Sequence, residues 1–169
     1  MRLWGIGLLI AACILVSLQD LRLRRERIRA LGDLAQALRL LQGELSLHCE
    51  SLPQAFETLA CRCDGAGQEL FEALARESGR LGEERFEQIW RSCVSDSSRS
   101  LRTTERDRLE RLGQVLGRME LELQLQALEE TCAELREARA DAEESFPAER
   151  RLSIGLGAAV AALLGIVLL

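Results

Sequence analysis

The sequence predicts an all-α protein: a cytoplasmic antiparallel bundle of about six helices, framed by transmembrane helices at the N- and C-termini. Both ends of the chain are apolar runs without charge. Between them, leucines recur in steps of three and four, the spacing of one helix face. The two prolines lie outside these periodic stretches, so nothing interrupts long helices. We predict a transmembrane helix over 1–19, a cytoplasmic helical domain over 20–149 and a second transmembrane helix over 150–169.

The terminal runs, Leu3–Leu18 and Leu152–Leu169, contain no charged residue. A bilayer core needs roughly 20 helical residues, with a lower limit near 17, so both runs are short spans that depend on snorkelling flanks or local thinning. A cleavable signal peptide fits the first run poorly, since only Arg2 precedes it and no small-x-small site follows. A lipoprotein cleavage box at 10–13 fits poorly too, because apolar residues lie on both sides. Two membrane anchors are therefore expected.

Arginines flank both runs on the side of the central region, and we predict that they contact the membrane surface: Arg22, Arg24, Arg25, Arg27, Arg29, Arg150 and Arg151. Positive charge beside a membrane span marks its cytoplasmic end. The central region is therefore expected in the cytoplasm, with both termini across a cell membrane that the chain crosses twice. Lipid headgroups are the first predicted partner.

The central region is acidic. Residues 30–149 carry 14 Arg against 25 Asp and Glu, a charge of −11, whereas residues 22–29 carry five Arg against one Glu. An acidic body argues against nucleic acid as a partner, because phosphates require a basic surface. The chain has no Lys, which excludes a phosphate-binding loop of the Gly-x-x-x-x-Gly-Lys-Ser/Thr type.

Helical periodicity divides the central region. The first helix is expected to continue from the membrane to about Leu47, with one apolar stripe made of Leu31, Leu34, Leu38, Leu41 and Leu45. Ser51-Leu52-Pro53 signals the start of a short second helix, which ends before Gly65-Ala66-Gly67. Apolar residues from Leu70 to Ala75 indicate a third helix that ends near Gly79.

Three further helices are expected. The fourth carries the apolar residues between Phe86 and Val94, and a serine-rich loop follows at 95–100. Thr103 or Thr104 caps the fifth helix. Gly117 offers a turn or a close helix contact before the sixth helix, about 118–145, after which Pro147 is expected to kink the chain. The apolar stripe of the sixth helix is Leu121, Leu125, Leu128, Cys132 and Leu135. A stripe of this length is more typical of a helix that faces a shared core than of a coiled-coil seam between copies.

No catalytic, cofactor or metal site is predicted. The six cysteines are too scattered for a disulfide scaffold and are interpreted as reduced, small apolar residues. A zinc site at His48, Cys49, Cys61 and Cys63 is disfavoured, because Cys-x-Cys is tighter than the usual ligand spacing. His48 and Cys49 are neighbours, so on a helix their side chains diverge by about 100° and cannot form a nucleophile pair. We predict that the protein is not an enzyme.

Particular residues carry a family resemblance. Leu41-Gln-Gly-Glu44-Leu45, followed by Leu52, Ala55 and Phe56, resembles a Leu-x-x-Glu-Ile segment leading to Leu-x-x-Ala-Phe in stage III sporulation protein AB, a membrane protein of endospore-forming bacteria. Trp90 stands where that family has a tryptophan. The residues from Leu112 to Gln124 are similar to its Phe-Gly-x-x-Leu-Gly-x-x-Asp-x-x-x-Gln pattern, with Gly113 and Gly117 at the glycines. Glu120 replaces the Asp, and Pro53 follows the Leu that the family's Pro tends to precede.

The resemblance implies more than the residues themselves do. The family's soluble domain is similar to the F-domain of the inner-membrane platform protein of type II secretion and type IV pili. The resemblance therefore implies that the protein is a platform in a secretion-like complex between mother cell and forespore, on the mother-cell side of the outer forespore membrane. The implied partners are a cognate secretion-type ATPase and other stage III sporulation proteins. Gly113 and Gly117 would let helices five and six approach, and Gly117, Glu120 and Gln124 are the candidate partner-binding residues.

Two other interpretations stay open. The chain could be a membrane-tethered signalling or assembly adaptor unrelated to sporulation, which docks a soluble partner through its sixth helix. It could instead be a membrane enzyme with Cys49 or Cys61 as nucleophile, which requires a thiol of lowered pKa. The sequence leaves open whether the protein forms homo-oligomers, which surface contacts the ATPase and what the complex transports. Because neither anchor contains a charge, tethering is favoured over lining a channel.

Overall fold

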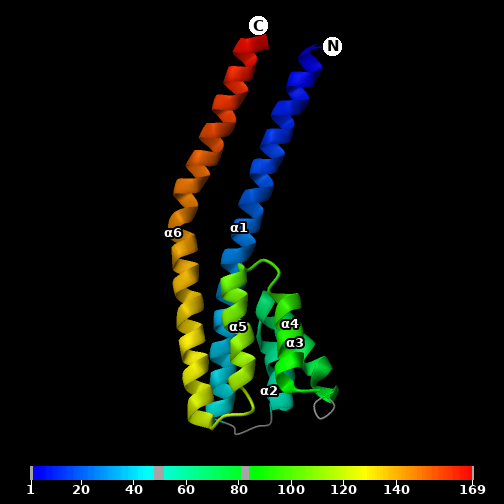
Figure 1. Ribbon diagram of the computed structural model, residues 1–169, viewed down its shortest axis with the longest axis vertical. Helices are drawn as coiled ribbons and strands as arrows, with labels where there is room; N and C mark the ends of the chain where they lie inside the picture. The colour runs from blue at the N-terminus through cyan, green and yellow to red at the C-terminus, as the bar shows by residue number, and fades with distance from the viewer. Residues whose placement is uncertain (1, 48–51, 81–83, 169) are drawn as a thin grey trace. The chain divides into compact units, whose positions relative to one another are not determined.

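The computed structural model describes the backbone of residues 2–47, 52–80 and 84–168, and the side chains of residues 19–46, 52–80 and 84–145. These residues form helices and no strand, which confirms the all-α bundle (Figure 1). The elements are α1 (Arg2–Leu47), α2 (Leu52–Arg62), α3 (Gly65–Glu77), the short 3₁₀ turn η1 (Ser78–Arg80), α4 (Phe86–Ser97), α5 (Thr103–Val115) and α6 (Leu121–Leu168).

Contacts divide the chain into two units. One is the helical bundle, Arg27–Arg139, and the other combines Met1–Glu26 with Ala140–Leu169. The second unit contains the predicted transmembrane helices 1–19 and 150–169, whose backbone is helical from Arg2 and up to Leu168. Nearly all their side chains lie outside the described residues. Within the described residues, no helical stretch has the length and apolarity that a membrane span requires.

Within the bundle, α1 supplies the central part of the core. All five leucines of its predicted stripe are buried: Leu31, Leu34, Leu38, Leu41 and Leu45. Ala30, Ala35 and Ala37 are buried as well, so the buried surface is wider than one stripe. A helix buried on several faces must have neighbours on several sides.

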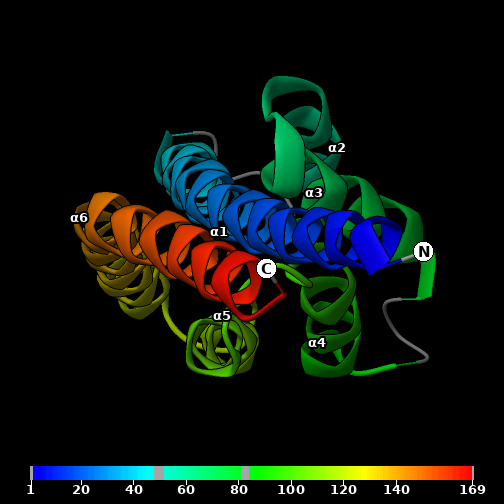
Figure 2. The ribbon, with the colours of Figure 1, turned by 90° about the horizontal axis from the view of Figure 1, so that it is seen from above.

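Contacts identify those neighbours, and Figure 2 shows the bundle part of α1, from Arg27 on, with the bundle part of α6 on one side and α2 on the other. The Cys132 thiol on α6 donates to the Ala35 carbonyl, 3.5 Å away. Gly67 of α3 lies so near α1 that an added Cβ would be 2.7 Å from the Ala37 Cβ. The helices α2, α3, α4 and α5 pack against one another in chain order. The first helix therefore packs against both α3 and α6.

Aromatic rings fill the space between α2, α3 and α4. Phe56 stacks on Phe71 and on Phe86, with centroid distances of 5.9 and 6.2 Å, and Phe86 lies 5.9 Å from Trp90. Such pairs add about 0.5–1.5 kcal/mol each beyond the area they bury. The chain has few aromatic residues, and the bundle concentrates them in one cluster.

Several element boundaries differ from expectation. Helix α3 begins at Gly65, several residues before its apolar pattern. Helix α4 extends to Ser97, into the expected serine-rich loop, and the Ser97 hydroxyl donates to the Cys93 carbonyl (2.9 Å) one turn back. The N-cap of α5 is Arg102 and not a threonine, and α6 runs without interruption through Pro147.

Candidate functional site

The predicted partner-binding residues lie at the turn between α5 and α6. Gly117 has φ +75°, a left-handed conformation that favours glycine. Its backbone N–H donates to Gln124 Oε1 (3.1 Å), and Gln124 Nε2 donates to the Met119 carbonyl (2.7 Å). The side chain of Gln124 is therefore hydrogen-bonded to the backbone of the turn at two positions, Gly117 and Met119. Gly117 and Gln124 act together to set the conformation of residues 117–124.

Glu120, the third predicted residue, immediately precedes α6. Its carbonyl accepts the Gln124 backbone N–H (3.1 Å), which starts the hydrogen-bond ladder of α6, and the residue is exposed. A carboxylate at this end of a helix is favoured by the helix dipole. Of the three predicted residues, Glu120 is the one that presents a charged side chain to solvent.

Apolar side chains surround this turn. Met119, Leu121 and Leu123 are 50%, 42% and 49% exposed, although large apolar residues elsewhere in the bundle are mostly buried. Periodicity placed Leu121 in the core stripe and did not single out Met119 or Leu123. Only the C-terminal part of that stripe, Leu128, Cys132 and Leu135, is fully in the core.

Gly113 has a different neighbour from the one expected. The resemblance implied that Gly113 lets α5 approach α6, but an added Cβ at Gly113 would lie 2.6 Å from the Trp90 Cγ on α4. The Trp90 indole N–H donates to the Leu109 carbonyl on α5 (2.7 Å), so the ring packs against that helix. The glycine and the tryptophan of the family pattern thus form one α4–α5 contact.

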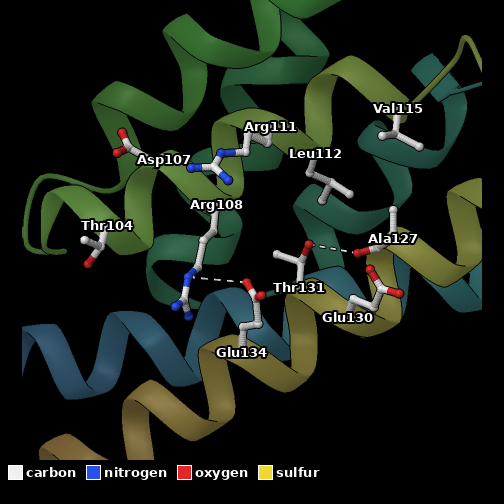
Figure 3. Close-up of a pocket in the computed structure, with 10 residues that line it drawn as sticks. All are labelled: Thr104, Asp107, Arg108, Arg111, Leu112, Val115, Ala127, Glu130, Thr131 and Glu134. Carbon is white, nitrogen blue, oxygen red and sulfur yellow. Dashed lines mark hydrogen bonds and ion pairs between the residues drawn. The ribbon is translucent and has the colours of Figure 1, made fainter.

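A groove of about 480 Å³ lies between α5 and α6 (Figure 3). Apolar side chains of Leu112, Val115 and Ala127 line it together with charged ones. Arg108 Nε lies 3.4 Å from Glu134 Oε2 across the groove. The remaining lining residues are Thr104, Asp107, Arg111, Glu130 and Thr131. The groove is mixed in charge, with an apolar end towards Val115.

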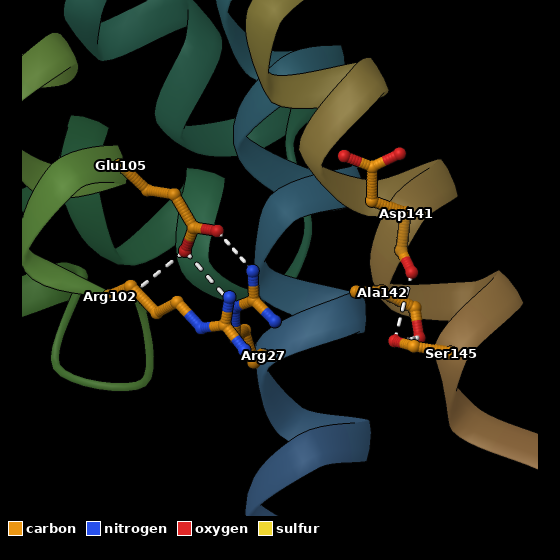
Figure 4. Close-up of polar contacts among 6 residues, drawn as sticks. All are labelled: Arg27, Arg102, Glu105, Asp141, Ala142 and Ser145. Atoms are coloured by element: carbon orange, nitrogen blue, oxygen red, sulfur yellow. Dashed lines mark hydrogen bonds and ion pairs between the residues drawn. The ribbon is translucent and has the colours of Figure 1, made fainter. Parts of the chain in front are cut away.

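An ion pair joins α1 to α5 inside the bundle (Figure 4). Arg27 donates through Nε to Glu105 Oε2 (3.2 Å) and through a second nitrogen to Oε1, and the backbone N–H of Arg102 donates to Oε2 (2.9 Å). Burial alone would raise the pKa of Glu105, but the bonds from Arg27 and Arg102 outweigh it, so this pKa is lower than its ordinary value of 4.5. Glu105 also caps α5 by holding the Arg102 N–H.

A second buried carboxylate belongs to the family pattern. Glu44 on α1 is 7% exposed, and its side chain pairs with Arg62 at the end of α2. The glutamate of the Leu-x-x-Glu segment therefore fixes the α1–α2 packing, which the sequence did not predict.

The predicted membrane-surface arginines are not alike. Arg22, Arg25 and Arg29 are exposed, and Arg24 pairs with Asp20 at 2.9 Å. The Arg27 side chain is only 16% exposed and, in contrast with the expected contact with lipid headgroups, faces Glu105. The side chains of Arg150 and Arg151 lie outside the described residues.

In the unit that contains Ala140–Leu169, the Ser145 hydroxyl donates to the Asp141 and Ala142 carbonyls, one turn back along α6 (Figure 4).

The described cysteines fall into two classes. Burial raises the pKa of Cys63 and of Cys93 to about 11, and it raises the pKa of Cys132 too. Thiols in this state are poor nucleophiles. Cys61 is exposed, while Cys49 and His48 lie outside the described residues. Within the described residues, no group of three metal-ligating side chains occurs.

Comparisons with known proteins agree with these features. A solved structure of a stage III sporulation protein AB matches the fold with a TM-score of 0.64 and 22% identity, and the match covers 72% of this chain and 97% of that one. No curated protein matches the chain. The family of stage III sporulation protein AB matches residues 2–169, which include both terminal runs, the Glu44 segment and the Gly113–Gln124 pattern. The chain belongs to the stage III sporulation protein AB family.

Proposed function

We propose that this protein is a membrane-anchored platform of a sporulation-specific, secretion-like complex, and that its bundle docks a cognate secretion-type ATPase. Family membership supports a role in sporulation. The single observation that carries docking is the α5–α6 turn, where Gln124 and Gly117 hold exposed Glu120 and its apolar neighbours in one conformation. A preordered surface loses little entropy on binding.

Several features support a platform with no chemistry of its own. The polar residues of the family pattern make structural contacts: Glu44 forms an ion pair with Arg62 between α1 and α2, and Gln124 accepts a hydrogen bond from the Gly117 N–H in the turn. The buried thiols have raised pKa values. We propose that residues 1–19 and 150–169 anchor the chain in the membrane, with the arginines next to them at the lipid surface and the bundle in the mother-cell cytoplasm.

Co-purification tests the docking. The full-length protein and its neighbouring ATPase are co-expressed, extracted in detergent and recovered through a tag on the platform. We expect co-elution of the wild type and its loss on Glu120→Arg. Glu137→Arg is the matched control, because Glu137 is another exposed glutamate on α6. Co-elution that survives Glu120→Arg moves the interface elsewhere, and no co-elution of the folded wild type contradicts the platform.

The adaptor predicts a different cellular result. If the protein serves signalling unrelated to sporulation, its deletion leaves spore formation intact. We expect deletion to stop spore formation and a Glu120→Arg copy to restore it poorly. Counting heat-resistant spores from the two strains separates the two functions.

A further inference from the structure

We propose that Met119, Leu121 and Leu123, together with Glu120 and Glu122, form a docking surface whose partner presents an apolar patch bordered by Lys and Arg. This surface is called the turn patch below. The inference rests on the proposed function and deepens it, because it states what the partner's contact surface must contain. It also moves the contact away from Gly117 and Gln124, whose bonds lie within the turn.

The concentration of exposed apolar residues is the first argument. Among the described residues, four large apolar side chains are strongly exposed, and three of them lie between residues 119 and 123. The fourth, Leu23, belongs to the other unit of the chain. Scattered exposed leucines need no explanation, but a local group of them marks an interaction surface.

Local structure is the second argument. The turn patch is ordered: Gln124 bonds the Gly117 N–H and the Met119 carbonyl, and Leu52 of α2 lies against Gly117, 3.1 Å from where a Cβ would stand. Leu123 lies one helical turn before Ala127, which lines the groove between α5 and α6. The apolar side chain of a partner can therefore continue from Leu123 into the apolar end of that groove.

Charge identifies the occupant. From Met119 to Leu135 the chain contains five glutamates and no basic residue. One of them, Glu134, pairs with Arg108; the others are Glu120, Glu122, Glu129 and Glu130, all of them exposed. A basic border on the partner would complement this surface and speed association.

The same charge disfavours two other occupants. A second copy related by a two-fold axis would place the same acidic surface opposite itself, and like charges facing one another cost binding energy. Anionic lipid headgroups would be repelled in the same way. A basic protein partner is the occupant that the turn patch favours.

Binding measurements test the turn patch. The full-length protein in detergent is immobilised and titrated with the cognate ATPase. We expect Leu123→Ser to weaken binding about tenfold or more, the size of a central interface residue, and Leu23→Ser to change it less than about twofold. The pair is matched, since both are exposed leucines. Thermal unfolding of each variant confirms that it is folded.

A charge variant provides an independent readout. We expect the association rate of the wild type to fall on the order of tenfold when salt is raised from low to high concentration. Glu122→Arg should lower the association rate at low salt and flatten its salt dependence. Glu137→Arg, which lies away from the turn patch, should have a smaller effect on both.

Each outcome decides between the claims. If the wild type binds but Met119→Ser, Leu123→Ser and Glu122→Arg all bind as tightly, the turn patch is wrong and the platform stands. If the folded wild type does not bind the ATPase, the proposed function fails and this inference fails with it. If light scattering shows that Leu123→Ser dissociates an oligomer of the wild type while ATPase binding is unchanged, a second copy occupies the patch and the inference is overturned.

Discussion

The buried stretch of α1 and the turn between α5 and α6 are both rich in leucine, but they are held in opposite ways. In α1, Leu31 through Leu45 are covered by other helices. At the turn, Met119, Leu121 and Leu123 are exposed, and hydrogen bonds of Gln124 hold the backbone. Apolar burial stabilises the first region, whereas polar bonds order the second and leave its apolar side chains available. The same residue type therefore serves folding in one place and contact in the other.

Leucine truncation tests this contrast most strongly. Leu38→Ala in α1 should lower the free energy of unfolding by about 3 kcal/mol, because Leu38 is fully buried and its removal leaves a cavity. Leu121→Ala at the turn should change it by less than about 0.5 kcal/mol. Urea unfolding of both variants measures the difference, and equal losses would contradict the contrast.

The ion pair between Arg27 and Glu105 shows whether α1 also depends on polar contacts. Glu105→Gln should lower the free energy of unfolding by about 2 kcal/mol, since it leaves the mostly buried Arg27 side chain without its carboxylate. The folded state lowers the pKa of Glu105, so its contribution is present above the ordinary value of 4.5 and is lost as pH falls through the folded pKa. The difference in free energy of unfolding between the wild type and Glu105→Gln should therefore disappear in acid.

Unfolding curves between about pH 7 and pH 3 measure that difference. Arg27→Gln should cost a similar amount, and the double variant should cost clearly less than the two single losses summed. Strict additivity would show that the two side chains do not stabilise each other.

Glycine substitution tests whether close packing in the core depends on particular glycines. Gly113→Ala should cost about 2 kcal/mol, because its Cβ would overlap Trp90 in the core. Gly43→Ala is the control: Gly43 lies within α1 with nothing within 4 Å of an added Cβ, so alanine should stabilise the helix by about 0.5–1 kcal/mol. Thermal unfolding of the two variants should shift in opposite directions, and a Gly113→Ala variant as stable as the wild type would place Gly113 outside the tight contact.

The smallest effect is expected at the turn itself. Gly117→Ala should cost about 1 kcal/mol, since φ is +75° there and alanine is strained in that conformation. Gly117→Asn should cost less, because asparagine tolerates left-handed backbone better. Urea unfolding compares them; an alanine variant as stable as the wild type would mean that the turn does not need glycine.

The sequence predicted what local periodicity can reveal. The five leucines of α1 and the C-terminal end of the α6 stripe lie in the core as expected. Periodicity could not show that Leu121 lies where neighbours no longer cover α6, because it describes one helix and not the length of the others. The partner of Gly113 was mistaken for the same reason: a small residue signals a close contact but does not say with which helix.

Charged pairs distant in sequence were beyond prediction. Arg27 and Glu105 are 78 positions apart, and Arg27 looks like any other arginine of its cluster. Glu44 belongs to a family segment of the sequence, but only the fold shows that it pairs with Arg62. At the candidate site, the pattern indicates Glu120 and Gly117, but it does not indicate Met119 and Leu123, because periodicity within one helix does not show which of its side chains other helices cover.

The central position of α1 also governs the order in which the chain can fold. The helices α2 to α5 each pack on the next, so these contacts form between segments close in sequence, which is fast. The first helix packs against α6 as well as α3, and the hydrogen bond from the Cys132 thiol to the Ala35 carbonyl joins residues 97 positions apart. During synthesis, the apolar faces of α1 therefore stay partly uncovered until residues near 139 have left the ribosome. A chain stopped before α6 would expose apolar side chains of α1 that α6 otherwise covers, and it would be prone to aggregation.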